Sequence, residues 1–279
     1  FQSLAEYVTP WAPKIYFSTG IYWRELNVRA AYRVYQLALR RGYIVPPERY
    51  VDLDEEYANS AADGIICLGN AETGSTYDKF PQVHCLNNAA FPINGQPWLE
   101  KDYAAGRKHF FFFSGRGNVH RGLDLLLEAF AGTDLHLHIC QHIEPEFARI
   151  YHHELNELPN IHLHGFINMR SSEFESLTRA CNWIILPTCA EGQPGSVIEC
   201  MAYGLIPILP RAASIDLEDF GLDIPALDVE IIRSVICAAA QLEVDECRRR
   251  SHAAAAAVAV SYTVEAFRSE LKNAILQIV

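Results

Sequence analysis

At residues 191–199 the chain reads EGQPGSVIE, in which two carboxylates bracket a loop of glycine and proline. The preceding run, residues 183–187, is short, apolar and closed by proline, and it predicts a strand buried in a parallel sheet. The following run, residues 196–203, predicts a helix that stops at Gly204. Loops of such units lie at the carboxyl end of the strand, where open α/β sheets bind phosphorylated ligands. The stretch therefore predicts an α/β fold with a ligand crevice beside Glu191.

The sequence leaves two interpretations of Ser196 and Glu199 open. They match a capping box, in which the serine caps the helix and the glutamate reaches back to it. Alternatively, Glu191 and Glu199 accept hydrogen bonds from hydroxyl groups, so that one holds a sugar and the other a ribose. The two glycines and the proline favour binding, because a purely structural connection does not need them.

A second candidate loop follows the aromatic run at residues 109–113, where the chain reads FSGRGNVHRGLD from 113 to 124. The run suits a central strand, and the glycines of the loop permit the close backbone approach that a phosphate requires. From residue 123 onward apolar side chains recur at helical spacing. Arg116 and Arg121 add positive charge, so the loop predicts a phosphate site. The alternative is a surface loop with two solvated arginines.

Together with the turn Gly165-Phe166-Ile167, these two loops resemble the C-terminal domain of retaining glycosyltransferases of family 4, which have the GT-B fold. The matched region runs from about residue 109 to 210. The resemblance implies that Arg116 and Arg121 grip the donor diphosphate. Arg121 stands where the family usually has lysine, and arginine keeps the charge but adds a planar fork.

The resemblance also implies roles for the carboxylates and for the turn. Glu199 would bind the donor ribose, Glu191 would engage the donor sugar, and the backbone near Phe166 would meet the base. The family motif commonly reads Glu-Gly-Phe-Gly, whereas Gln193 and Pro194 follow here, so no contact is carried over to Gln193. The other implied donor-binding positions are small residues of the same loops: Gly115, Gly192, Gly195 and Ser196.

Strand and helix patterns alternate along the chain, with a break at the Pro- and Gly-containing residues 92–97. We expect an α/β protein of GT-B type with two Rossmann-like domains, each a doubly wound parallel sheet. Residues 1–95 would form a partial, acceptor-side N-terminal domain and residues 96–279 the nucleotide-sugar-binding domain, with a last helix at about 264–278 crossing back. The first domain is short for this fold and the chain begins at Phe1, so a fragment is expected.

The predicted strands lie at residues 14–18, 64–68, 83–86, 109–113, 135–139, 161–164, 183–186 and 206–209.

Composition narrows the possible partners. The chain has 279 residues and a formal net charge of −11, which argues against a general nucleic-acid surface because that needs a broad basic field. No apolar run is long enough to span a bilayer, while peripheral contact with a membrane-borne acceptor stays open. The eight cysteines lack Cys-x-x-Cys spacing and predict buried thiols in a reducing compartment, hence a cytoplasmic protein.

Histidines alternate at His136/His138 and His162/His164, so each pair shares one face of a strand. No cluster of carboxylates or cysteines accompanies them, and we expect no metal site.

The predicted function is that of a glycosyltransferase, hexosyltransferase-like, which moves a sugar from a nucleotide diphosphate sugar to a glycan, lipid or small-molecule acceptor with retention of configuration. We expect no cofactor and no metal, because arginines and helix amides would stabilise the leaving diphosphate. Two alternatives stay open. One is a non-catalytic nucleotide-sugar-binding module. The other, weaker one is a Rossmann dehydrogenase, whose fingerprint lacks its third glycine at the required spacing.

Overall fold

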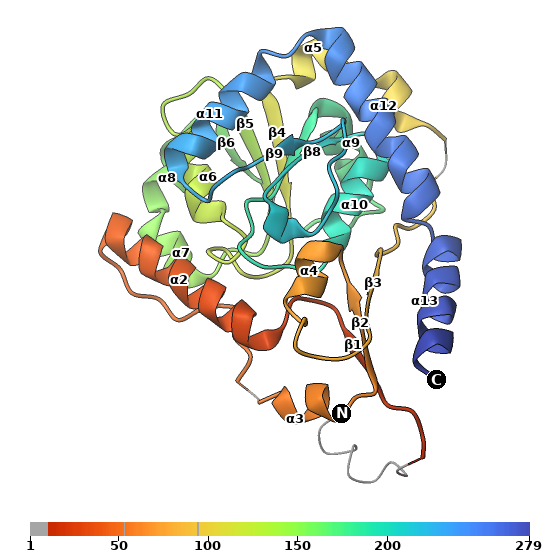
Figure 1. Ribbon diagram of the computed structural model, residues 1–279. Helices are drawn as coiled ribbons and strands as arrows, with labels where there is room; N and C mark the ends of the chain where they lie inside the picture. Colours follow the sequence, from red (N-terminus) through yellow and green to blue (C-terminus); the bar gives the residue numbers. More distant parts are fainter. Residues whose placement is uncertain (1–10, 53, 94) are drawn as a thin grey trace.

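A computed structural model describes residues 11–52, 54–93 and 95–279, and these residues form two parallel sheets (Figure 1). The first sheet has the order β1 (Ile15–Ser18), β2 (Gly64–Leu68), β3 (Val83–Leu86). The second has the order β6-β5-β4-β7-β8-β9, and every pairing in both sheets is parallel. The described residues therefore form the predicted α/β fold with parallel sheets.

The strand order of the second sheet reverses between β4 and β7, as a doubly wound sheet requires. In the first sheet the three strands follow one another in chain order. The strands of the second sheet are β4 (His109–Phe113), β5 (His136–Cys140), β6 (Ile161–Leu163), β7 (Trp183–Ile185), β8 (Ile206–Leu209) and β9 (Leu222–Asp223).

Helices cover the second sheet, whose central strands β4, β7 and β8 are almost completely buried. The helix α6 (Leu123–Phe130) contacts α11 (Val229–Ala240), and α10 (Gly195–Ala202) contacts α12 (Val244–Ser261). Figure 1 shows these two pairs on opposite sides of the sheet. Burial on both faces explains why β7 and β8 are continuous apolar runs and why β4 is apolar after His109, whereas the outer strands β5 and β6 alternate with histidine.

The shorter helices occupy the connections. They are α3 (Glu56–Ser60), α4 (Ala71–Ser75), α5 (Tyr103–Gly106), α7 (Pro145–Ile150), α8 (His152–Glu157) and α9 (Ser172–Ala180), with 3₁₀ turns at Pro97–Glu100 and Arg211–Ala213.

The helix α2 (Trp23–Arg41) follows β1 but packs into the second domain. Its Leu37 and the nearby Val45 belong to the same buried apolar cluster as the strands of the second sheet. Its Arg33 is 1% exposed, and Nη2 of this side chain donates to both carboxylate oxygens of Asp124 in α6 at 2.8 Å. The helix ends at Gly42, which takes the left-handed backbone conformation. The first sheet is thus tied to the second domain through the core.

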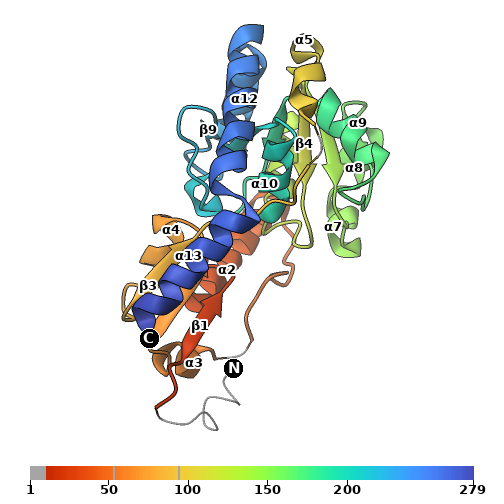
Figure 2. The same ribbon diagram turned by 90° about the vertical axis from the view of Figure 1, so that its right-hand side faces the viewer.

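The last helix, α13 (Val264–Ile278), lies along the first sheet, whereas α12 lies along the second domain (Figure 2). Ala274 and Ile278 pack against Ile66 and Leu86. Gly64 of β2 makes room for this contact, because a Cβ there would lie 2.6 Å from the Ile278 side chain. Each end of the chain described here therefore contributes to holding the two sheets together.

The eight predicted strands agree with the structure to within one residue at each end, and β9, of two residues, is the one strand of the described residues that was not predicted. The helix predicted at 196–203 begins at Gly195 and its last turn ends at Ala202 before Tyr203 and Gly204. Asn94 of the predicted linker and residues 1–10 of the predicted first domain lie outside the described residues. Among the described helices, none has the length and apolarity to cross a membrane.

Candidate functional site

Glu191 lies in the loop after β7, with 8% of its surface exposed. Its Oε1 atom is 3.1 Å from Nη1 of Arg121 and 3.3 Å from Nη1 of Arg49, and Thr188 Oγ1 donates to it at 3.3 Å. The Glu191 backbone N–H donates to Ala212 O at 3.1 Å, which fixes the loop. The buried carboxylate therefore has two guanidinium partners and one hydroxyl donor around it.

Gly192 allows this loop to touch the first domain. A Cβ at that position would lie 2.4 Å from Thr19 O and 2.8 Å from Leu68 O. Thr19 directly follows β1 and Leu68 is the last residue of β2, so the loop that carries Glu191 packs directly against the carboxyl ends of these two strands. No side chain larger than hydrogen fits here without moving backbone.

Gln193 stands at a position that departs from the family pattern, and it connects the two domains. Its Nε2 donates to Asn87 Oδ1 at 2.7 Å, and its Oε1 accepts from the Asn88 backbone N–H at 2.7 Å. Asn88 Nδ2 in turn donates to Gln193 O at 3.1 Å. The sequence had given neither Gln193 nor the asparagine pair a role, because their pairing depends on a contact between residues about one hundred positions apart.

Glu199 does not form a capping box. The helix α10 begins at Gly195 after Pro194, Ser196 lies inside its first turn, and no side chain caps it. Glu199 Oε1 instead accepts a hydrogen bond from the Phe91 backbone N–H at 2.6 Å. Burial raises the pKa of Glu199, although this hydrogen bond and the charge of Arg170 oppose the shift. The capping interpretation is therefore wrong, and the carboxylate faces the segment between the two sheets.

The two arginines of the other loop have different surroundings. Arg121 is mostly buried, binds Glu191 and donates from Nε to Arg116 O at 3.2 Å. Burial lowers the pKa of Arg121, and the nearby Glu191 opposes this shift. Arg116 is exposed and forms no ion pair with the residues that the structure describes. It lines a cavity of about 370 Å³ together with Glu48 and Val119.

Backbone geometry explains the glycines of this loop. Gly117 and Gly122 have φ angles of 100° and 78°, which disfavour other residues. A Cβ at Gly122 would lie 2.3 Å from Pro187 O, so the arginine loop and the loop after β7 come into direct contact. Gly115 is exposed, and a Cβ added there would meet no atom within 4 Å.

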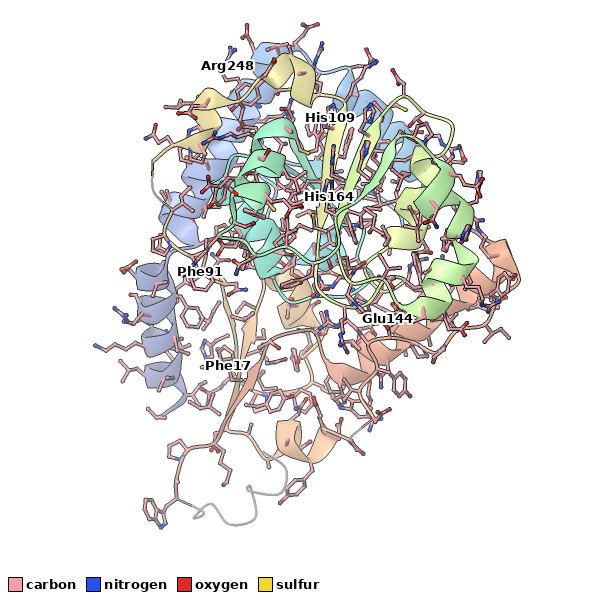
Figure 3. The ribbon with its side chains drawn as sticks, turned by 180° about the vertical axis from the view of Figure 1, so that it is seen from behind. Phe17, Phe91, His109, Glu144, His164 and Arg248 are labelled. Atoms are coloured by element: carbon pink, nitrogen blue, oxygen red, sulfur yellow. The ribbon has the colours of Figure 1, made fainter. Side chains whose placement is uncertain are left out.

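Phe166 follows Gly165, whose φ is 73°, and its side chain is 85% exposed. Phe91 is also more than half exposed, and the Arg170 Cζ atom lies 5.2 Å from the centre of its ring. Figure 3 shows Phe91 at the junction of the two domains. The structure brings Arg121 and Glu191 together, while it leaves Phe166 at the surface.

His120 belongs to the site, and the sequence had given it no role. Its Nε2–H donates to Ala190 O at 2.7 Å, and its Nδ1 lies 3.5 Å from Cys189 Sγ. Burial, together with the charge of Arg49, lowers the pKa of His120 to about 3, so the ring is neutral. The one feature of the sequence that could have pointed to His120 is its position directly before Arg121. Its hydrogen bond holds the backbone just before Glu191.

Glu48 and Arg49 also reach the site from the irregular segment between α2 and α3. Glu48 Oε2 accepts from the Val119 N–H at 2.8 Å and from the His120 N–H at 3.4 Å, while Arg49 binds Glu191. No pattern in the sequence marks these two residues, because the segment has no periodicity that would orient it.

Histidine side chains lie in a row across β4, β5 and β6. His138 Nε2 is 3.0 Å from His109 Nδ1 and its Nδ1 is 3.1 Å from His164 Nε2, while His136 Nδ1 is 3.0 Å from His162 Nε2. The predicted sharing of one face is confirmed, and the rings bond to one another. Among the described residues, no group of three or more histidines, cysteines or acidic residues could hold a metal ion.

Residues 97–214 match the sequence family described as glycosyl transferases group 1, a range that contains both loops of the site. A search of curated proteins found no match.

Solved structures share the fold. Sucrose-phosphate synthase from Thermosynechococcus elongatus is 18% identical with a TM-score of 0.67, and 95% of this chain aligns with 67% of that one. HepE from Anabaena, solved with UDP and glucose, is 12% identical with a TM-score of 0.65, and 95% aligns with 72%. TarM from S. aureus, solved with fondaparinux, α-GlcNAc-glycerol and UDP, is 16% identical with a TM-score of 0.64, and 79% of this chain aligns. The chain spans only 46% of that TarM chain. At such identities the likeness shows the GT-B fold alone.

Proposed function

We propose that this chain is a glycosyltransferase that takes its sugar from a nucleotide diphosphate sugar bound between the two sheets. One observation carries the proposal: Arg121 and Glu191 meet at 3.1 Å at the carboxyl ends of β4 and β7. These two strands flank the reversal of strand order, and the crevice outside such a reversal is where open α/β sheets bind their ligands. The group 1 match at residues 97–214 supports the same chemistry.

The proposed donor contacts follow from charge and exposure. Arg116 has a guanidinium group free for the diphosphate, and Arg121 lies within reach of the same loop. Glu199 would accept from the ribose and Glu191 from the sugar, while the backbone near Phe166 would meet the base. The backbone at Gly115, Gly192, Gly195 and Ser196 would line the donor.

The leaving group of the reaction is a nucleoside diphosphate, whose negative charge grows as the bond to the anomeric carbon breaks. Preorganised cations in a site of low dielectric stabilise such charge more than water does. Arg116 and Arg121 would supply these cations, so we propose transfer without a metal. Retention of configuration is proposed from the resemblance to family 4.

Acceptor and location are part of the proposal. The first sheet, within residues 1–95, would bind a glycan, lipid or small-molecule acceptor, and residues 96–279 would bind the donor. All eight cysteines are free thiols, which supports a reducing compartment such as the cytoplasm.

A second candidate function is a non-catalytic nucleotide-sugar-binding module. It is favoured by the protein partners that both carboxylates already have, Arg49 on Glu191 and the Phe91 N–H on Glu199. A module of this kind would bind a donor without turning it over.

Two experiments test the proposal in sequence. Calorimetry against a panel of nucleoside diphosphates, starting with UDP, is expected to give binding to one base and much weaker binding of the corresponding nucleoside. Incubation with the matching labelled nucleotide sugar and an acceptor mixture should then release the nucleoside diphosphate. Binding without release would favour the second candidate, and the absence of binding to the whole panel would refute both.

A further inference from the structure

The segment between α2 and α3 crosses the arginine loop and brings a carboxylate to it. Pro46 and Glu48 line the cavity of about 370 Å³ beside Arg116. Glu48 Oε2 accepts from two consecutive backbone N–H groups, those of Val119 and His120, at 2.8 and 3.4 Å. Consecutive amides that converge on one oxygen form an anion-binding concavity, and here a side chain of the protein fills it.

The next residue, Arg49, reaches the second half of the site. Its Nη1 is 3.3 Å from Glu191 Oε1, and its side chain runs close over Gly117, where a Cβ would lie 3.2 Å from Arg49 Cδ. Two neighbouring residues therefore place a negative group on the amides of the arginine loop and a positive group on the carboxylate of the loop after β7. A nucleotide sugar would present a diphosphate to the first position and hydroxyl groups to the second.

We propose that Glu48 and Arg49 form an internal strap that occupies the donor site and competes with the donor diphosphate. This inference rests on the proposed function, since it names what regulates access to the same site. In the strapped state the N–H groups of Val119 and His120 already donate hydrogen bonds to Glu48. A diphosphate can therefore accept these hydrogen bonds only after the Glu48 carboxylate has moved away.

The contacts of Glu48 allow a ligand to displace its carboxylate from the arginine loop. It has backbone amides as partners and no ion pair with any residue that the structure describes. Burial raises the pKa of Glu48, because the amide hydrogen bonds do not fully replace the water that the carboxylate loses. A diphosphate brings more charge to the same amides and also attracts Arg116 and Arg121.

A purely structural role makes the opposite prediction. If Glu48 only joins the two domains, its loss lowers the melting temperature and loosens the donor site, so diphosphate affinity falls or stays the same. If it is a strap, its loss removes a competitor and affinity rises. Strapped states of this kind leave the open form at about 0.1–10% of the population, so abolishing the strap should tighten binding about tenfold or more.

The experiment measures binding by the parent chain and by Glu48→Gln, which keeps the side chain's size but removes its charge. Three probes are titrated by calorimetry: inorganic diphosphate, UDP and uridine. We expect Glu48→Gln to bind both diphosphates about tenfold tighter and uridine as the parent does. Glu144→Gln serves as the matched control. Glu144 lines the same cavity at the start of α7 (Figure 3), and among the described residues its carboxylate pairs with His142 alone, at 3.8 Å.

Equal affinities for inorganic diphosphate in the parent and in Glu48→Gln would overturn the strap, as would an equal gain in Glu144→Gln, which would reveal a general charge effect. If Glu48→Gln is less stable than the parent, amide hydrogen exchange provides a second test of the strap. The Val119 amide should exchange faster in Glu48→Gln than in the parent and become protected when diphosphate is added. Unchanged exchange of that amide would also refute the proposal.

The outcomes separate the strap from the proposed function. Tighter binding of inorganic diphosphate, with UDP no better than inorganic diphosphate, would support the strap and count against a nucleotide-sugar site. Strong UDP binding that is equal in parent and variant would support the site and refute the strap. If no diphosphate binds to either protein, both are refuted.

Discussion

At the scale of single residues, the two arginines of the 115–122 loop differ in what they already bind. Arg121 is buried against Glu191, while the exposed Arg116 has no ionic partner within the described chain. A side chain without an ionic partner can bind a ligand without first breaking an ion pair. Arg116 is therefore the better test of the proposed diphosphate site.

Replacing Arg116 by alanine should weaken nucleoside diphosphate binding by about 1.5–3 kcal/mol, the usual worth of a hydrogen bond to a charged group. The melting temperature should hardly change, because the side chain is exposed. Arg121→Ala is the comparison: it should reduce both affinity and stability, since it leaves the buried Glu191 with one cation fewer. Calorimetry and thermal unfolding of both variants measure these effects. An equal loss of nucleoside and diphosphate binding in Arg116→Ala would contradict the assignment.

Glu199→Gln separates ligand binding from structure at the second carboxylate. The amide oxygen of glutamine can still accept from the Phe91 N–H, so stability should be nearly unchanged. A neutral amide accepts less strongly from ribose hydroxyls, and affinity for a nucleoside diphosphate should fall by about 1 kcal/mol. Titration of the variant against the parent gives the answer, and unchanged affinity would remove Glu199 from the site.

At the scale of elements, α2 is attached to the second domain by buried charge. Arg33 and Asp124 are 1% and 0% exposed, and Arg40 also binds Asp124. Asp124→Asn would leave the buried Arg33 without its carboxylate and Arg40 with Glu128 alone, so we expect it to lower the free energy of unfolding by about 3–5 kcal/mol. Glu25→Gln, which breaks the more exposed Glu25–Arg29 pair, should cost about 0–1 kcal/mol. Urea unfolding measures the free energy of unfolding of both variants. A similarly small loss in both would show that the ion pairs of Asp124 contribute little to stability.

The histidine row on β4, β5 and β6 makes these strands sensitive to acid. Burial, and the neighbouring histidines, lower the pKa of His138 to about 3, and burial lowers the pKa of His109, His162 and His164. These groups bind protons more readily in the unfolded chain, whose histidines have pKa values of about 6.5. Stability should therefore be full above about pH 6.5 and fall as the pH drops toward 3.

Urea unfolding at a series of pH values measures how steeply the free energy of unfolding falls with pH, and we call this dependence the slope. His138→Gln should flatten it, because the variant removes the ring with the largest shift in the row. His120 titrates over the same range and is unaffected by the change, so part of the slope remains. The charge of Glu173 near His164 acts in the opposite direction. A slope identical in the variant and the parent would show that the row does not couple to folding.

At the scale of the whole molecule, the two sheets share one core. Leu37 and Val45 of the first part of the chain belong to the apolar cluster of the second sheet, and α13 returns to pack on β2 and β3. The loop with Gly192 adds a direct backbone contact between them. We expect a single cooperative unfolding transition, with near-ultraviolet circular dichroism and tryptophan fluorescence changing together. Two separated transitions would show that the domains unfold independently.

Fold class and strand positions were predictable from the sequence because they depend on local pattern. Apolar residues bounded by glycine, proline or polar residues place each long strand, and they form continuous runs in the strands that are buried on both faces, such as β2, β7 and β8. The two-residue β9 has no run of its own and was missed. The loops with Glu191 and Arg121 were likewise visible, since glycines and charged residues at a strand end mark a crevice.

The sequence by itself thus determined the α/β fold and the two loops that meet at the reversal of strand order. The tertiary structure alone decided what those loops touch: Arg49 on Glu191, the Phe91 N–H on Glu199, Asn88 on Gln193 and Glu48 on the amides of the arginine loop. The physical reason is distance along the chain. Strand and helix patterns are local, whereas each of these contacts joins residues about 70 to 140 positions apart and arises only when α2 and the strand ends of the first sheet pack against the second.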